Sequence, residues 1–174
     1  MRWRHFSFML LALYWGLALA QYRVRYEPTP MPVVQAMTDL AAVDAGDVVY
    51  DLGCGDGRIV ITATQRYGCR GVGIDIDPER IREATGNVQK AKVADKVKLI
   101  QGDLFETDIG EATVVTLYLL TELNLKLRPK LMKELRPGTR VVSHAFAMGD
   151  WKPERTEQVN GASVYLWRIP PRKA

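Results

Sequence analysis

The residues best suited to chemistry are acidic side chains at the ends of three predicted strands, beside a glycine-rich turn. Asp51 precedes the turn at 53–57, Asp75 follows 24 positions after Asp51, and Asp103 follows the next apolar run. Glycines allow a tight turn and a close approach to a ligand, and the helix after them adds free N–H groups. Because such strand ends converge on one crevice in a parallel sheet, the pattern predicts a nucleotide-like cofactor site.

The turn also discriminates between cofactors. A dinucleotide site would need a third glycine where this chain has Arg58, and Asp51 would repel phosphates but suits the ammonium of a methionine moiety. Asp75 can accept hydrogen bonds from ribose hydroxyls, while Asp103 can bind an adenine amino group. We therefore expect S-adenosylmethionine. The predicted cofactor residues are Thr29, Asp51, Gly53, Gly55, Asp75, Ile76, Asp103 and Leu104.

The sequence predicts the methyl acceptor less specifically than it predicts the cofactor. Methyl transfer from a sulfonium is an in-line displacement, so the protein mainly aligns a nucleophile and excludes water. Residues 116–121, at the end of the fourth predicted strand, lack the Asn/Asp-Pro-Pro-aromatic box and the Pro-Cys pair of specialised methyltransferases. This favours an amine or thiol acceptor. We predict Tyr118 and His144 as catalytic candidates and Tyr118, Asn124 and Trp151 as pocket walls, with structural roles as the alternative.

Strands and helices must alternate to position these residues. Predicted strands cover 47–51, 71–75, 97–100, 112–118 and 138–143. Predicted helices cover 58–67, 78 to about 91 with Asp77 as the N-cap, and about 123–135, the last interrupted at Pro129. Thr29 and Pro30 are suited to start an earlier helix. Asn160-Gly161 predicts a hairpin between the last two strands. The fold class is therefore α/β: a doubly wound, mostly parallel sheet ending in an antiparallel hairpin.

A hydrophobic segment precedes this domain. Residues 6–20 are almost wholly apolar, Arg2 and Arg4 stand before them, and the run Ala18–Ala20 resembles a signal-peptidase site. A signal peptide cleaved after Ala20 and an uncleaved membrane anchor are both open. Because S-adenosylmethionine is made in the cytosol, we favour an anchor with the domain facing the cytoplasm. The expected organisation is the hydrophobic segment 1–20, a lid and first helix at 21–46, and a methyltransferase domain at 47–170.

Composition narrows the function classes further. The 174 residues suit one domain, and the net charge of +4 is too small to indicate a nucleic-acid partner. Only two cysteines occur, Cys54 and Cys69, and no cluster has the spacing of zinc ligands. We expect free thiols, no metal and no nucleic-acid partner.

These motifs resemble those of the class I methyltransferases, which implies a Rossmann-like sheet of seven strands. More narrowly, residues 26–30, 51–60, 137–143 and 151–153 resemble the membrane-associated lysine methyltransferases that modify the ATP synthase c-subunit and the adenine nucleotide translocase, and their bacterial relatives. The resemblance covers roughly 24–170 and implies a membrane-protein lysine as acceptor. That branch usually has Glu where this chain has Asp75, and the different ending of the fourth strand leaves the acceptor open. A small amine, thiol or lipid-like acceptor and a catalytically inactive cofactor-binding module are the alternatives.

Overall fold

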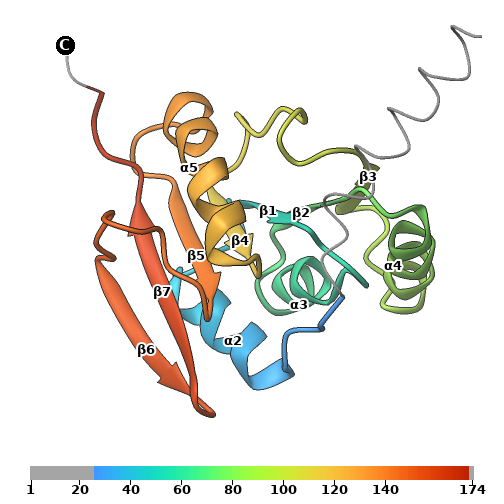
Figure 1. Ribbon diagram of the computed structural model, residues 1–174. Coiled ribbons are helices and arrows are strands. Elements are labelled where there is room, and N and C mark those ends of the chain that lie inside the picture. The colour runs from blue at the N-terminus through green and yellow to red at the C-terminus, as the bar shows by residue number, and fades with distance from the viewer. Residues whose placement is uncertain (1–25, 173–174) are drawn as a thin grey trace, which may run out of the picture.

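A computed structural model describes residues 26–172 (Figure 1). The predicted hydrophobic segment at 1–20 lies outside the described residues. Within 26–172, no helix combines the length and apolarity that crossing a bilayer requires.

The core of the fold is a seven-stranded sheet with the strand order β3-β2-β1-β4-β5-β7-β6. Strands β1 to β5 pair in parallel, and β7 is antiparallel to both β5 and β6. The strands are β1 Val48–Leu52, β2 Arg70–Asp75, β3 Val97–Gln101, β4 Val114–Leu117, β5 Arg140–His144, β6 Arg155–Val159 and β7 Ala162–Arg168. This confirms the predicted fold class.

The predicted hairpin forms at Asn160 and Gly161, whose φ angles of 51° and 81° suit a tight two-residue turn. The second strand of the hairpin, β7, inserts beside β5 and leaves β6 at the edge. The burial of the two strands explains this order, because β7 buries Trp167 whereas β6 exposes Arg155 and Gln158. A polar edge strand also discourages pairing with another chain.

Helices cover both faces of the sheet (Figure 1). On one face, α2 and α3 share a buried apolar cluster with β1, β4, β5 and β7, and α4 packs against α3, β2 and β3. On the other face, α5 contributes Leu127 and Leu131 to the largest cluster. The helices are α2 Met31–Leu40, α3 Arg58–Tyr67, α4 Pro78–Lys90 and α5 Thr121–Glu134.

Two local predictions need correction. The interruption expected at Pro129 does not occur, because α5 is continuous from Thr121 to Glu134 with the proline inside it. Leu127 and Leu131 are fully buried on either side of Pro129, so their packing holds the helix together across the missing backbone donor. The N-cap of α2 is Pro30, with no side-chain cap, so Thr29 does not cap that helix.

Candidate functional site

The carboxyl ends of the parallel strands open into a cavity of about 530 Å³. Its walls come from the segment 26–30, the glycine-rich turn, and the residues that follow β2, β3 and β4. The cavity brings together these predicted site residues: Thr29, Asp51, Gly53, Asp75, Ile76, Asp103, Leu104 and Tyr118. The position agrees with the rule that doubly wound sheets bind ligands outside the carboxyl ends of their strands.

The glycine-rich turn has the backbone shape that its composition predicts. Gly53, Gly55 and Gly57 have φ angles of 84°, 53° and 81°, which residues with a side chain rarely adopt. Gly55 does not line the cavity. Instead its N–H donates to Oδ2 of Asp75 at 2.9 Å, and a Cβ on Gly55 would lie only 2.3 Å from the ring of Tyr26. Gly55 therefore lets the segment 26–30 lie directly on the turn.

Gly55→Val is expected to abolish cofactor binding while the sheet stays folded. The side chain would strain the backbone and displace Tyr26, so the segment 26–30 would no longer pack on the turn at the cavity wall. Calorimetry with the cofactor, paired with circular dichroism, would measure both effects. Normal affinity in a folded variant would show that the turn has no part in binding.

Asp75, the last residue of β2, has its carboxylate held by backbone donors. Oδ2 accepts from Gly55 and Oδ1 accepts from the N–H of Asp77 at 3.0 Å. A carboxylate oxygen has two lone pairs, so both oxygens keep capacity for ribose hydroxyls. The backbone bonds orient Asp75 before a ligand arrives.

Asp75→Ala is expected to weaken cofactor binding by about 2 kcal/mol, because a hydrogen bond to a charged group contributes roughly 1.5–3 kcal/mol. Asp75→Asn, which retains one acceptor oxygen, should lose less. Titration calorimetry on both variants would rank them, with thermal unfolding to check the turn. Equal affinity in the alanine variant and the natural protein would remove Asp75 from the site.

Asp51 is the most deeply buried acid of the cavity wall, with 2% of its surface exposed. Its Oδ1 accepts a hydrogen bond of 2.8 Å from the hydroxyl of Thr116 on the neighbouring strand β4. Burial raises the pKa of Asp51 to about 7, although the hydrogen bond from Thr116 opposes the shift. A cation beside this carboxylate would restore its charge, so the position suits an ammonium group.

Asp103 and two apolar side chains form the end of the cavity beyond β3. Oδ1 of Asp103 accepts from the N–H of Phe105 at 2.8 Å, which fixes the carboxylate at the start of a turn. Leu104 is half-buried against the main core and Ile76 is exposed at the rim. Together they offer an acceptor for an adenine amino group and apolar surfaces for its ring.

Sequence reasoning missed the residues that hold the segment 26–30 in place. Arg58 donates to the carbonyl of Thr29 at 3.1 Å and pairs with Asp56 at 2.6 Å. Arg80 lies over the ring of Tyr26, 4.8 Å from its centroid. Asp56 and Arg58 flank the last glycine of the turn. This pair of opposite charges was the feature of the sequence that could have indicated an ion pair at the turn.

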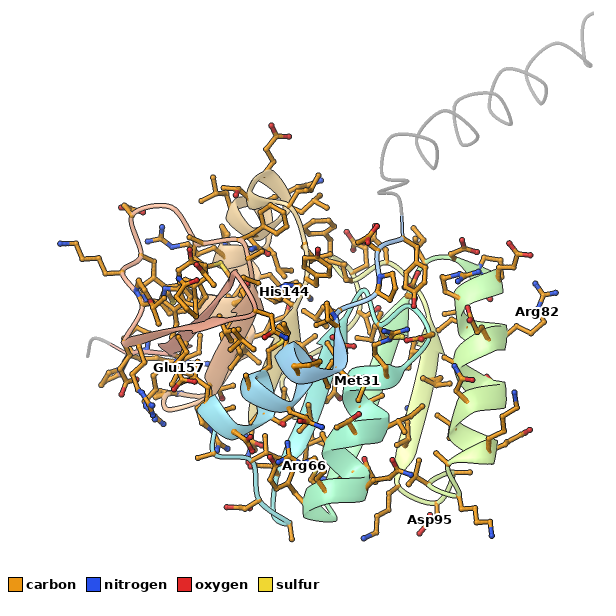
Figure 2. All side chains as sticks on the ribbon, turned by 90° about the horizontal axis from the view of Figure 1, so that it is seen from below. Met31, Arg66, Arg82, Asp95, His144 and Glu157 are labelled. Carbon is orange, nitrogen blue, oxygen red and sulfur yellow. The ribbon has the colours of Figure 1, made fainter. Side chains whose placement is uncertain are left out.

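The acceptor-side predictions divide between the cavity and the core. Tyr118 follows β4 and lines the cavity with Leu119 and Leu123. His144 is buried behind Tyr118, with ring centroids 3.9 Å apart, and does not line the cavity. Figure 2 shows His144 near the start of α2, where Met31 is labelled. Burial lowers the pKa of His144, so the ring is neutral near pH 7.

Asn124 and Trp151, predicted as pocket walls, are not brought into the cavity wall. Asn124 is fully buried on α5 and donates to the carbonyl of Phe146 at 3.2 Å. Trp151 packs near Trp167, and its carbonyl accepts from the indole N–H of Trp167 at 2.7 Å. Both residues support the chain around β5 and β7.

The described residues contain two cysteines and no group of metal ligands. Cys54 and Cys69 are buried free thiols, as predicted. Burial raises the pKa of both thiols, which keeps them in the neutral form. Residues 26–172 contain no group of three potential His, Cys, Asp or Glu ligands placed to hold a metal ion.

The acidic residues of the cavity fit S-adenosylmethionine, which supplies an electrophilic methyl group on a sulfonium. Asp51 suits its ammonium, Asp75 its ribose and Asp103 its adenine, while the cavity holds no cluster of cations for a pyrophosphate. Fold and site together define an S-adenosylmethionine-dependent methyltransferase of the doubly wound α/β class.

Comparison with known proteins identifies the family. The model of the ANTKMT methyltransferase domain matches residues 51–155, and the chain belongs to this family. A protein-lysine N-methyltransferase of Saccharolobus islandicus (strain REY15A) is 49% identical over 155 residues, covering 86% of this chain and 96% of the relative. The ATP synthase C-subunit lysine N-methyltransferase of Homo sapiens is 24% identical over 164 residues, covering 86% of this chain and 70% of the relative.

A solved structure is also similar to this chain. The crystal structure of an RNA methyltransferase from Salinibacter ruber in complex with S-adenosyl-L-homocysteine superposes with a TM-score of 0.83 at 58% identity. The match covers 85% of this chain and 97% of that chain. The demethylated cofactor in that relative agrees with the cofactor predicted from the sequence.

Proposed function

We propose that this methyltransferase N-methylates a lysine of a protein located at a membrane. The observation that carries the proposal is the charge of the cavity wall, which contains seven carboxylates but only two guanidinium groups. The whole chain, by contrast, has a net charge of +4. The charged lining residues are Glu27, Asp51, Asp56, Asp75, Asp77, Glu79, Asp103, Arg58 and Arg80. A cleft lined by one sign of charge concentrates ligands of the opposite sign, which favours a cationic acceptor.

The wall beside Tyr118 suits the rest of a lysine side chain. Leu119, Leu123 and Phe105 line this part of the cavity, so the methylene groups can pack on apolar surface while the amine approaches the methyl group. Only a neutral amine has the lone pair that attacks. No general base is needed, since the proton can leave to water and the cofactor activates the carbon.

The relatives support two acceptor classes, and the charge favours one. The relative that is 49% identical is named a protein-lysine N-methyltransferase, whereas the solved structure that is 58% identical is titled an RNA methyltransferase. RNA binding depends on cations that neutralise phosphates, and the acidic cavity wall opposes it. RNA is the second candidate for this chain because of that relative.

Attachment to a membrane is supported by the apolar side chains around the cavity. Tyr26, Ile76, Leu120 and Met31 are exposed; the first two line the cavity, and the others stand where α5 and α2 begin. In the sequence, the apolar run at 6–20 is separated by five residues from Tyr26, which lines the cavity. This arrangement would hold the cavity close to a bilayer, with the domain on the cytoplasmic side where the cofactor is made. Export after cleavage following Ala20 is the alternative.

Transfer of a labelled methyl group tests the acceptor. The purified protein is incubated with methyl-labelled cofactor and, in separate reactions, with membrane proteins, total RNA or a lipid extract, using Gly55→Val as the background. Label in a protein band, found on lysine after hydrolysis, supports the proposal. Label in RNA or in the organic phase replaces it with another acceptor class, and no transfer to any fraction supports an inactive binding module.

Cell fractionation tests the location. The full chain should sediment with membranes, keep its N-terminal Met1-Arg2 sequence, and expose its domain to protease only after the cytoplasm is opened. A soluble exported product beginning at Gln21 would overturn the membrane proposal and leave the acceptor assay unaffected.

A further inference from the structure

A buried contact connects His144 with the segment that lies over the cavity. The Oγ1 of Thr29 is 3.4 Å from Nδ1 of His144, across 115 positions of sequence. Both residues are only 4% exposed, so the contact is largely shielded from bulk water. Because Thr29 does not cap α2, its hydroxyl is available to the imidazole.

The other side of the imidazole contacts Tyr118. The two rings are tilted by 31° with centroids 3.9 Å apart, and only the tyrosine reaches the cavity. His144 thus touches one wall of the cofactor site through Thr29 and the acceptor wall through Tyr118.

The chain after β5 is bent sharply to make this arrangement. Ala145 has a φ of 64°, and the N–H of Phe146 donates to the carbonyl of His144 at 2.8 Å. A hydrogen bond over two residues with a positive φ defines a γ-turn of the rarer, strained form. The turn brings the ring of Phe146 within 6.0 Å of Tyr118, so both ends of the turn contact that tyrosine. Strain of this kind persists where surrounding contacts enforce it, often at functional sites.

We propose that His144 is a positioning residue that couples the segment 26–30 to Tyr118. Through Thr29 it holds the segment against the cofactor, and through ring packing it sets the orientation of the tyrosine beside the acceptor. The inference rests on the proposed acceptor position beside Tyr118. It assigns His144 no proton transfer, consistent with its place behind the cavity wall.

Two substitutions at His144 separate the two contacts. His144→Phe keeps a ring against Tyr118 but removes Nδ1, so it should weaken cofactor binding by about 2- to 10-fold, the range of one neutral hydrogen bond. His144→Asn keeps a hydrogen-bonding group for Thr29 but removes the ring, so its cofactor affinity should be closer to that of the natural protein while kcat falls. Calorimetry measures the first effect without any acceptor.

A double-mutant cycle tests whether Thr29 acts through His144. Thr29→Val should weaken cofactor binding as much as His144→Phe does, and the double variant should be no weaker than either single variant. Thr139→Val is the matched control, since Thr139 is also buried and donates to the carbonyl of Ala112 at 3.3 Å beside the opposite end of β5. It should lower the melting temperature without changing cofactor affinity.

Independent effects of Thr29→Val and His144→Phe, multiplying in the double variant, would overturn the coupling. So would equal cofactor affinities in Thr29→Val and Thr139→Val. If His144→Asn and His144→Phe lower kcat equally and leave cofactor affinity unchanged, His144 does not hold the segment. The measurements of cofactor affinity need no acceptor, so they test the coupling even if the acceptor is not a lysine. Failure of the proposed function is therefore recognised separately.

Discussion

Asp51→Asn is expected to abolish cofactor binding and, at the same time, to stabilise the cofactor-free protein above pH 7. The substitution removes the charge that would pair with an ammonium group, while the amide oxygen still accepts the hydrogen bond from Thr116. One change therefore separates the binding role of Asp51 from its cost to stability.

The expected pH dependence follows from the burial of Asp51. Its pKa rises from 3.8 to about 7 in the folded protein, so the native state binds more protons than the unfolded chain between those values. The contribution of Asp51 to stability is complete below about pH 4 and is lost as the pH rises through 7. A shift of this size corresponds to on the order of 4 kcal/mol.

Urea unfolding of both proteins at pH 4.5 and pH 8 measures the effect on stability. Between pH 4.5 and pH 8, the free energy of unfolding of the variant should rise relative to that of the natural protein by most of this amount. In the natural protein, cofactor binding at pH 6 should release a proton, which calorimetry in buffers of different ionisation enthalpy detects. A stability difference that does not change with pH, or unchanged cofactor affinity in Asp51→Asn, would contradict the assignment.

Tyr118→Phe is expected to slow methyl transfer by about tenfold to a thousandfold with little change in cofactor affinity. The ring would keep its packing on His144, so the loss of rate measures the contribution of one hydroxyl group at the cavity wall. Each tenfold corresponds to about 1.4 kcal/mol of transition-state stabilisation. Single-turnover rates with labelled cofactor, together with calorimetry, separate transfer from binding.

The pH profile of the same reaction identifies the group that limits it. With an amine acceptor, the rate should rise toward the pKa of lysine, near 10.4 in water. His144→Ala should slow transfer less than Tyr118→Phe does. A profile that breaks near 6.5, with the rate lost in His144→Ala but kept in Tyr118→Phe, would make the histidine a base. The place of His144 behind Tyr118, outside the cavity wall, argues against that result.

Local chemistry explains why the cofactor side was predictable from sequence. Strand, glycine turn and helix occur in immediate succession, so Asp51 and Asp75 must stand at neighbouring strand ends once the strands pair in parallel. The hairpin at 160–161 and the cap of α4 at Asp77 also depend on backbone preferences a few residues long. Such features are present in the sequence before any tertiary contact forms.

The acceptor side depended on packing between distant segments. Sequence analysis placed Asn124 and Trp151 at the pocket, but the buried side chain of Asn124 donates to the carbonyl of Phe146 and the ring of Trp151 packs near that of Trp167. Likewise, only the folded chain brings Tyr26 onto Gly55.

The sequence by itself thus determined the sheet, the cofactor and the carboxylates that suit it, because short-range periodicity and turn geometry specify those features. The tertiary structure decided that β7 inserts beside β5, and that His144 supports Tyr118 and Thr29 from behind the cavity. The physical reason is that burial and pairing across 115 positions depend on how whole layers pack, which no local pattern encodes.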